Sequence, residues 1–203
     1  MDYLFGLKTD KFVLLAADKN AARGISVLSS DVNKFYKLTS KCSMVCVGEG
    51  GAADQFANYI QKNVHLYKMR NDYEMTAQAA AHFARKTVAD GLRSRDGSYL
   101  VHFLVGGIDG GAQSVKPYLT YVDYLGSKYD APYVLHGYGG YFCYSILDRL
   151  YRNDMTEEEA VKALKTCLST LKTRFVINFP EFDAVIIDQN GTRKLGNIKT
   201  SDL

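Results

Sequence analysis

The sequence alternates pairs of predicted strands with pairs of predicted helices, and this order most restricts its fold. Short apolar runs mark the strands, and apolar residues three and four positions apart mark the helices. The predicted strands are residues 3–8, 12–17, 34–38, 43–47, 99–105, 118–124, 132–136, 182–188 and 192–195, and the predicted helices are residues 54–70, 76–95, 141–151 and the segment after 156. Such segregated pairs favour an α+β fold of two sheets flanked by helix pairs over a doubly wound parallel sheet.

Each long helical segment carries an apolar stripe that would face a sheet. Thr76 and Thr156 are suited to cap the second and fourth helices, and Glu159 completes a capping box with Thr156. The expected stripes are Phe56, Tyr59, Ile60, Val64 and Tyr67 in the first helix, Ala77, Ala80, Ala81, Ala84 and Val88 in the second, and Val161, Leu164, Leu168 and Leu171 in the fourth. The alanines allow the second helix to approach its neighbour closely.

Composition places the chain among globular proteins. Its 203 residues are 47% hydrophobic and 23% charged, and with three prolines they fit a single domain spanning residues 1–203. A net charge of +3 is too small to indicate binding to nucleic acid. No apolar run approaches the ~20 residues that cross a membrane. Because no secretory signal is visible, we expect a location in the cytoplasm and nucleus.

Metal and cofactor chemistry finds little support in the sequence. His65, His82, His102 and His136 share no metal-ligand spacing. Cys42, Cys46, Cys143 and Cys167 form no Cys-x-x-Cys pair, and we expect them to be reduced and mostly buried. The glycine-rich turn at residues 137–140 lacks the Gly-Lys-Ser/Thr ending of a phosphate-binding loop. We therefore expect neither a metal nor a cofactor.

Several short motifs occur in an order that resembles one known family over nearly the whole chain. They are AAD (16–18), Lys34, VCVGEGG (45–51), YVDY (121–124), HGYGG (136–140) and SILDR (145–149). Their order is similar to that of eukaryotic 20S proteasome beta-type subunits. Residues 59–71 are most similar to the non-catalytic beta type-2 members, which occupy the fourth position of the beta ring. The resemblance implies a four-layer αββα sandwich of the N-terminal-nucleophile hydrolase type.

Active members of this family attack an amide with an N-terminal threonine, assisted by a lysine and an aspartate. A glycine-rich turn stabilises the oxyanion through backbone N–H groups. The resemblance assigns Asp18 and Lys34 to the assisting positions and residues 48–50 to the turn. Met1 or Asp2 occupies the threonine position, and the family chemistry uses neither as a nucleophile. The resemblance therefore implies a non-catalytic subunit, in which Asp18 and Lys34 are a vestigial pair retained for folding.

Three further positions depart from the active pattern. Gly140 occupies the place of a serine, and Phe175 and Asn178 occupy the places of an aspartate and a serine. The main alternative is a catalytically active N-terminal threonine hydrolase, produced by processing at Thr9 or Thr39. Exposing Thr9 would remove one predicted strand, and exposing Thr39 would remove two strands and the lysine. A third interpretation is a self-contained α+β binding module.

The resemblance also implies partners. They are other beta subunits in the same ring and the opposite ring, together with alpha subunits. One neighbour would be the catalytic chymotrypsin-like subunit, and the loops after Asp18 and after Gly106 would wall a ligand groove shared with it. Eight tyrosines lie between residues 118 and 144, a pattern equally typical of a core edge and of a subunit contact.

Overall fold

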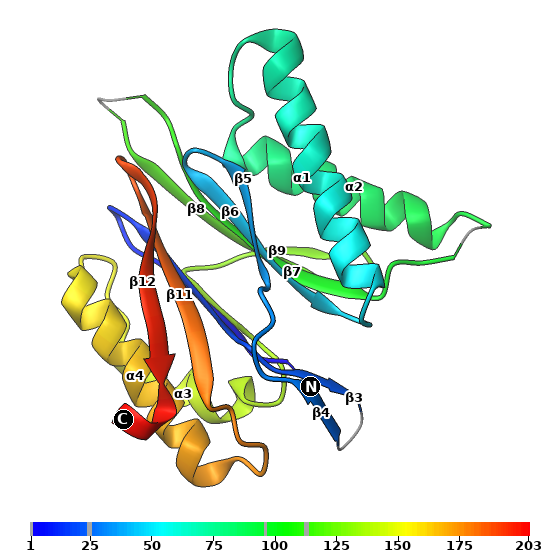
Figure 1. The fold of residues 1–203 in the computed structure, drawn as a ribbon. Helices are drawn as coiled ribbons and strands as arrows, with labels where there is room; N and C mark the ends of the chain where they lie inside the picture. Colours follow the sequence, from blue (N-terminus) through cyan, green and yellow to red (C-terminus); the bar gives the residue numbers. More distant parts are fainter. Residues whose placement is uncertain (1, 24–25, 96, 112–113) are drawn as a thin grey trace.

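Two antiparallel sheets stack face to face in the computed structural model, which describes residues 2–23, 26–95, 97–111 and 114–203 (Figure 1). In the described residues, one sheet has the strand order β10-β1-β2-β11-β12 and the other has the order β5-β6-β7-β8-β9. The strands of the first sheet are β1 (Leu4–Lys8), β2 (Val13–Asp18), β10 (Tyr133–His136), β11 (Glu181–Asp188) and β12 (Gly191–Lys199). Those of the second are β5 (Phe35–Thr39), β6 (Cys42–Gly48), β7 (Val101–Asp109), β8 (Lys116–Val122) and β9 (Lys128–Asp130).

A helix pair covers the outer face of each sheet (Figure 1). The pair on the second sheet is α1 (Ala52–Asn71) and α2 (Ala77–Leu92), and the pair on the first is α3 (Gly140–Leu150) and α4 (Glu157–Arg174). Thr76 caps α2, and Thr156 and Glu159 form the capping box of α4. A short 3-10 turn, η1 (Thr200–Asp202), follows β12.

Three apolar layers hold these four layers of secondary structure together. Leu164 and Phe182 belong to the layer between α3, α4 and the first sheet. Leu15 and Leu104 lie between the two sheets, and Phe56 belongs to the layer under α1 and α2. The predicted αββα sandwich is therefore confirmed, because each sheet buries one face against the other sheet and one against its helices.

The predicted helix faces are largely confirmed. Phe56, Ile60 and Val64 are buried in α1, and the whole alanine and valine stripe of α2 is buried. The prediction for Tyr59 is wrong, since its side chain is 49% exposed. Tyr59 instead stacks on Phe83 of α2 with ring centroids 6.5 Å apart, so it covers the seam between the two helices from outside.

The expected loop after Gly106 is a second wrong prediction, because Gly106 and Gly107 lie inside β7. A Cβ on Gly106 would lie 2.9 Å from Val13 Cγ1 of the facing sheet, and one on Gly107 would lie 2.5 Å from Ala77 Cβ of α2. These glycines therefore serve close packing on the two faces of one strand and not a turn. The following loop begins after Asp109, and residues 112–113 lie outside the described residues.

Two short elements escape the sequence pattern. One is the hairpin of β3 (Ala21–Arg23) and β4 (Ser26–Ser29), and the other is β9. Every residue of β4 is exposed, so this strand lacks the buried alternate positions that make a strand recognisable in sequence. Among the described residues, no helix combines the length and apolar character needed to cross a membrane.

Candidate functional site

Three charged side chains meet where the two sheets approach the start of the chain. Asp18 ends β2, Lys34 immediately precedes β5, and Asp2 precedes β1. Lys34 Nζ donates to Asp18 Oδ1 at 2.9 Å and to Asp2 Oδ1 at 2.7 Å. The Asp18 and Lys34 residues are only 1% and 6% exposed, so solvent screens their attraction weakly. The structure thus brings together the two residues that the sequence singles out, and it adds Asp2 as a second partner of the lysine.

The backbone around Asp18 is built to hold its carboxylate. Tyr3 N donates to Oδ1 at 2.8 Å, and Asn20 N donates to Oδ2 at 3.0 Å. Burial nevertheless raises the pKa of the Asp18 carboxyl above its ordinary value, because the loss of hydration outweighs the lowering by Lys34 and by the Tyr3 amide. Asp18 therefore ties β1, β2 and the segment before β5 together, at a desolvation cost that its hydrogen bonds and Lys34 offset only in part.

A cleft of about 660 Å³ opens beside these residues. Its walls come from the segment after Asp18, from the end of β6 and from the start of α1, and they include Asp2, Asn20, Lys34, Tyr36 and Glu49. Asn20 is 2% exposed, and its Oδ1 atom accepts no hydrogen bond from any described residue. Its Nδ2 atom donates to the carbonyl of Asn178 at 3.1 Å. A buried acceptor on this wall is one group that sequence reasoning missed, since a lone asparagine carries no motif.

The glycine turn at the end of β6 forms another wall of the cleft. Gly48 is required here, because a Cβ would lie 2.3 Å from the carbonyl oxygen of Leu100. The Glu49 N–H donates to that same carbonyl at 3.2 Å. The resemblance assigns oxyanion stabilisation to the amides of residues 48–50. The Glu49 amide of this segment already donates to a carbonyl within the protein.

The other departures from the active pattern lie apart from the Lys34 contact. Gly140 begins α3, where a Cβ would lie 3.2 Å from Leu135 Cβ. Phe175 follows the last residue of α4 as its C-cap and stacks on Phe179 with ring centroids 5.8 Å apart. Asn178 contacts the site through its backbone carbonyl, which accepts the hydrogen bond from Asn20 Nδ2. These positions contribute apolar packing and a backbone acceptor, and they supply no acid or base.

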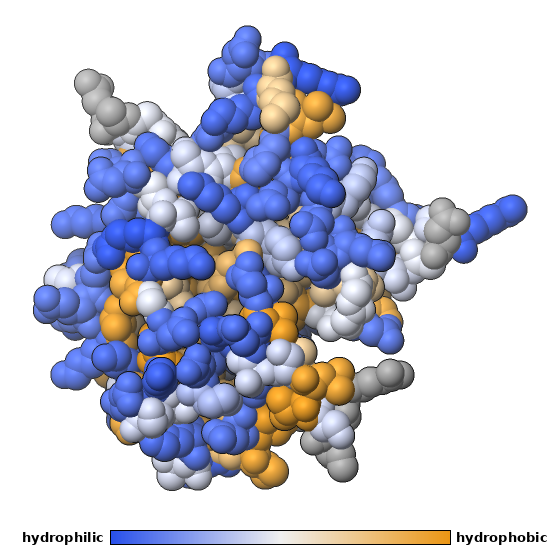
Figure 2. Space-filling model, in the orientation of Figure 1, coloured by the Kyte–Doolittle hydropathy of each residue, from blue (hydrophilic) through white to orange (hydrophobic). Residues whose placement is uncertain are grey.

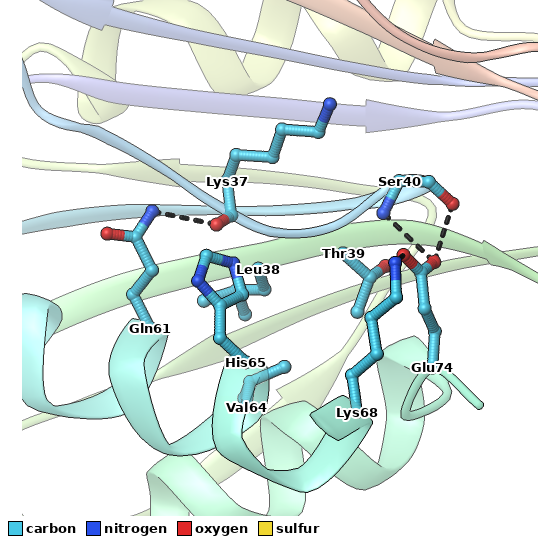
Figure 3. Close-up of a pocket in the computed structure, with 9 residues that line it drawn as sticks. All are labelled: Lys37, Leu38, Thr39, Ser40, Gln61, Val64, His65, Lys68 and Glu74. Carbon is cyan, nitrogen blue, oxygen red and sulfur yellow. Dashed lines mark hydrogen bonds and ion pairs between the residues drawn. The ribbon is translucent and has the colours of Figure 1, made fainter. Parts of the chain in front are cut away.

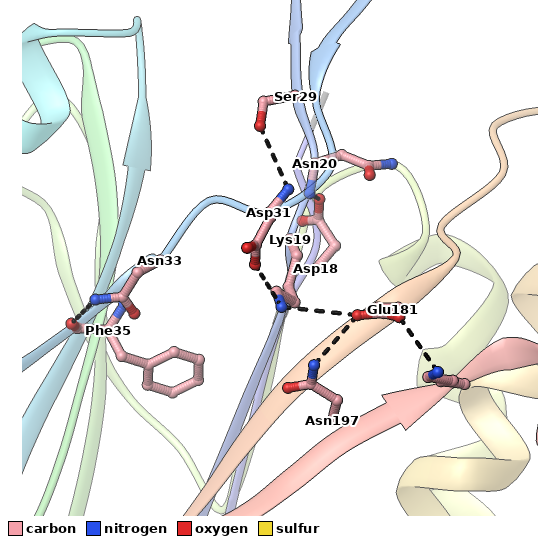
Figure 4. A network of polar contacts seen from close by, with 10 residues as sticks. Asp18, Lys19, Asn20, Ser29, Asp31, Asn33, Phe35, Glu181 and Asn197 are labelled. Carbon is pink, nitrogen blue, oxygen red and sulfur yellow. Dashed lines mark hydrogen bonds and ion pairs between the residues drawn. The ribbon is translucent and has the colours of Figure 1, made fainter.

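A network of ion pairs fixes the segment that follows Asp18 (Figure 4). Lys19 Nζ lies 2.6 Å from Asp31 Oδ1 and 3.7 Å from Glu181 Oε2. Glu181 also accepts from Asn197 at 3.2 Å and lies 3.9 Å from Lys199. Through Lys19, the segment that carries β3 and β4 is anchored to β11 and β12, which positions the cleft wall.

A different hollow, of about 500 Å³, lies between β5 and α1 (Figure 3). Ser40 and Lys68 both donate to the Glu74 carboxylate, and Gln61 Nε2 donates to the Lys37 carbonyl at 2.8 Å. Burial raises the pKa of the Glu74 carboxyl, whereas the hydrogen bonds from Ser40 and Lys68 lower it. The hydrogen bonds prevail, so the pKa lies below its ordinary value. These hydrogen bonds hold the edge strand β5 against α1. Because the polar groups are paired with one another, they supply no reactive centre.

Within the described ranges, no group of three or more His, Cys, Asp and Glu side chains is arranged to hold a metal ion. All four cysteines are buried as free thiols. Cys42 and Cys46 both belong to the layer under α1 and α2, as their even spacing predicts. Burial raises the pKa of both thiols well above the ordinary value, which makes them poor nucleophiles.

Comparison with known proteins agrees with the fold. The family model "Proteasome subunit" matches residues 4–187, and the chain therefore belongs to the proteasome family, in its beta-type branch. The chain is 42% identical to "Proteasome subunit beta type-2" of Caenorhabditis elegans over 200 residues, covering 98% of this chain and 99% of that protein. It is 40% identical to "Proteasome subunit beta type-4" of Saccharomyces cerevisiae, with 98% and 99% coverage. It is 36% identical to "Proteasome subunit beta type-2-B" of Arabidopsis thaliana over the full length of both chains. The predicted resemblance to beta-type subunits is confirmed.

Proposed function

We propose that this chain is a non-catalytic structural subunit of the 20S proteasome core. As a single domain it would occupy the fourth position of the beta ring, and it would help to enclose the proteolytic chamber used in ubiquitin-dependent protein degradation. Family membership supports the assembly role. The observation that supports the non-catalytic role is the placement of Lys34 between the carboxylates of Asp2 and Asp18.

This placement opposes catalysis for a chemical reason. Lys34 Nζ donates to two carboxylates, and among the described residues it has no hydrogen bond with a hydroxyl whose proton it could accept. The proposal also rests on the sequence, in which Met1 or Asp2 occupies the threonine position and neither serves as a nucleophile in this family. The three residues therefore form a structural ion-pair cluster and not an activated nucleophile.

The alternative of an active, processed threonine hydrolase conflicts with the role of both candidate threonines in the fold. Thr9 is 2% exposed, and cleavage before it would remove β1, which pairs with β2 and β10 in the first sheet. Cleavage before Thr39 would also remove β2 and Lys34. Either cut destroys the sheet that supports the site.

Exposed apolar side chains support assembly over a self-contained binding module. Val27 and Leu28 of β4 are 56% and 70% exposed, and Figure 2 shows apolar surface gathered over this hairpin. Patches of this kind mark contacts with other proteins. The partners we propose are beta subunits of the same and the opposite ring and alpha subunits, in the cytoplasm and nucleus. The cleft wall after Asp18 is our candidate for a ligand groove shared with the catalytic chymotrypsin-like neighbour.

An intact particle allows the catalytic question to be tested with an internal control. The tagged chain is purified gently from its own cells, treated with an electrophile that acylates N-terminal threonine, and analysed by native mass spectrometry with subunit ejection. We expect catalytic subunits in the same particle to gain the label while this chain stays unlabelled at full length. A labelled chain beginning at a threonine would overturn the non-catalytic role, and a lone monomer would overturn the assembly role.

A further inference from the structure

A pocket of about 730 Å³ lies beside the start of α3. It shares the Asp2 wall with the Lys34 cleft, and five of its eleven described lining residues are tyrosines. We call it the tyrosine socket. Its tyrosines are Tyr121 of β8, Tyr129 of β9, Tyr138 in the turn after β10, and Tyr141 and Tyr144 of α3.

Two of these rings are fixed from inside the protein. The Tyr144 hydroxyl donates to the Leu135 carbonyl at 3.0 Å and accepts from the Leu135 amide at 3.2 Å. The Tyr121 hydroxyl lies 2.7 Å from His102 Nδ1 and 3.0 Å from His136 Nδ1. The inner wall of the socket is therefore preorganised, and a bound group need not order it.

The other three rings form an open rim. Tyr129, Tyr138 and Tyr141 are 64%, 62% and 81% exposed. Large aromatic side chains left this exposed around a depression are typical of protein interfaces, where a tyrosine buries much area at a small entropic cost. The structure thus favours the subunit-contact interpretation of these tyrosines over the core-edge one.

The residues that line the socket favour a positively charged group on the partner. The described lining residues include no lysine or arginine, and they contain several π faces that attract cations. Next to the socket, Tyr133 donates to the Asp148 carboxylate on α3 and packs against Tyr144 with ring centroids 6.4 Å apart. Burial lowers the pKa of His136 to about 4. The ring is therefore neutral near neutral pH and adds no positive charge to the socket.

We propose that the tyrosine socket receives a lysine or arginine side chain from a neighbouring subunit, an inference that rests on the proposed role in a proteasome ring. The cation would lie against the faces of the rim tyrosines, and the surrounding interface would cover the rest of the rings.

A competition between two forms of the chain tests the socket in the assembled particle. Wild type and a variant carrying different mass tags are co-expressed at equal levels, and each is counted in purified particles by subunit ejection. We expect the double variant Tyr138→Leu, Tyr141→Leu to be under-represented by about 2- to 30-fold, the factor for loss of a cation–π contact. The double variant to Phe keeps both π faces and should compete equally. Tyr59→Leu, an exposed tyrosine of α1, is the control for loss of a ring elsewhere.

A photo-crosslinker identifies the occupant directly. p-Benzoylphenylalanine at position 141 should capture a peptide of another core subunit with a lysine or arginine next to the attachment point. Capture of a peptide without a basic residue, or equal loss of competition in the Phe and Leu variants, would overturn the socket while leaving ring assembly intact. Failure of wild type to enter any particle would instead overturn the proposed function.

Discussion

At the scale of single residues, the Asp18–Lys34 pair joins the two sheets through buried charges. Lys34 crosses from one sheet to the other and donates to two carboxylates, while backbone amides hold Asp18 from behind. Each partner makes the other's burial tolerable, because a single buried charge is far more costly than a paired one. The pair therefore needs no reaction to explain its presence.

Removing the lysine alone should be severe. We expect Lys34→Met to lower the free energy of unfolding by ~3–5 kcal/mol, because it strands the buried Asp18 carboxylate. Adding Asp18→Asn should recover part of this loss, since the fully buried position 18 then carries no charge. Lys86→Met removes an exposed pair with Asp90 and should cost less than ~0.5 kcal/mol. Chemical denaturation of the four proteins measures this, and equal effects of Lys34→Met and Lys86→Met would contradict a structural role for the pair.

At the scale of elements, packing decides where glycine is required. Gly107 of β7 leaves room for Ala77 of α2, and Gly106 leaves room for the facing sheet. The buried alanine stripe of α2 serves the same purpose from the helix side. Small residues on both surfaces set this layer spacing.

Gly107→Ala should therefore be costly although alanine is small. Its Cβ would lie 2.5 Å from Ala77 Cβ and 2.9 Å from the Lys41 carbonyl oxygen, which forces the layers apart. We expect a loss of ~1–3 kcal/mol in the free energy of unfolding. Gly50→Ala is the matched control, because no heavy atom lies within 4 Å of its added Cβ. A neutral Gly107→Ala would show that α2 can shift without cost.

The capping box of α4 gives a second prediction at this scale. Thr156 Oγ1 accepts from the Glu159 amide at 3.3 Å, and Glu159 Oε2 accepts from the Thr156 amide at 2.9 Å. Thr156→Ala should lower the free energy of unfolding by ~1 kcal/mol, because it leaves a helix amide without its partner. Thr156→Ser should retain most of the stability in the same denaturation assay. Similar losses for Ala and Ser would assign the effect to the lost methyl group.

At the scale of the whole molecule, a polar bridge joins the two sheets. Tyr121 of one sheet lies between His102 of the same sheet and His136 of the other, and the two imidazole rings stack 4.3 Å apart. A single hydroxyl proton cannot be donated to both rings, so one histidine accepts from Tyr121 and the other donates to it. The bridge is satisfied only while the accepting ring is unprotonated at Nδ1.

This bridge predicts an acid-dependent loss of stability. Burial and the neighbouring His102 lower the pKa of His136 to about 4, against the opposing effect of Asp2. The unfolded chain binds a proton on this histidine below pH ~6.5, whereas the folded chain does so only near pH 4. Stability should therefore fall as the pH is lowered from ~6.5 to about 4, by at most ~3 kcal/mol from this group.

Denaturation curves between pH 4 and pH 7.5 check the sign and the size of this effect. His136→Asn keeps a polar group near Nδ1 and should flatten the dependence. His65→Asn, on the exposed face of α1, should leave it unchanged. An unchanged slope in His136→Asn would assign the acid sensitivity to other groups.

The sequence by itself determined most of the elements, their order and the α+β class, and its resemblance to a family supplied the four-layer architecture and the candidates Asp18 and Lys34. It could do so because periodicity records which face of an element is buried, and because Asp18 and Lys34 belong to motifs in a characteristic order. Only the tertiary structure decided that Asp2 is the second partner of Lys34, that Gly106 and Gly107 lie inside a strand, and that the tyrosines form an open socket. Each of these depends on contacts between residues distant in sequence, where the spacing along the chain carries no information about the distance in space.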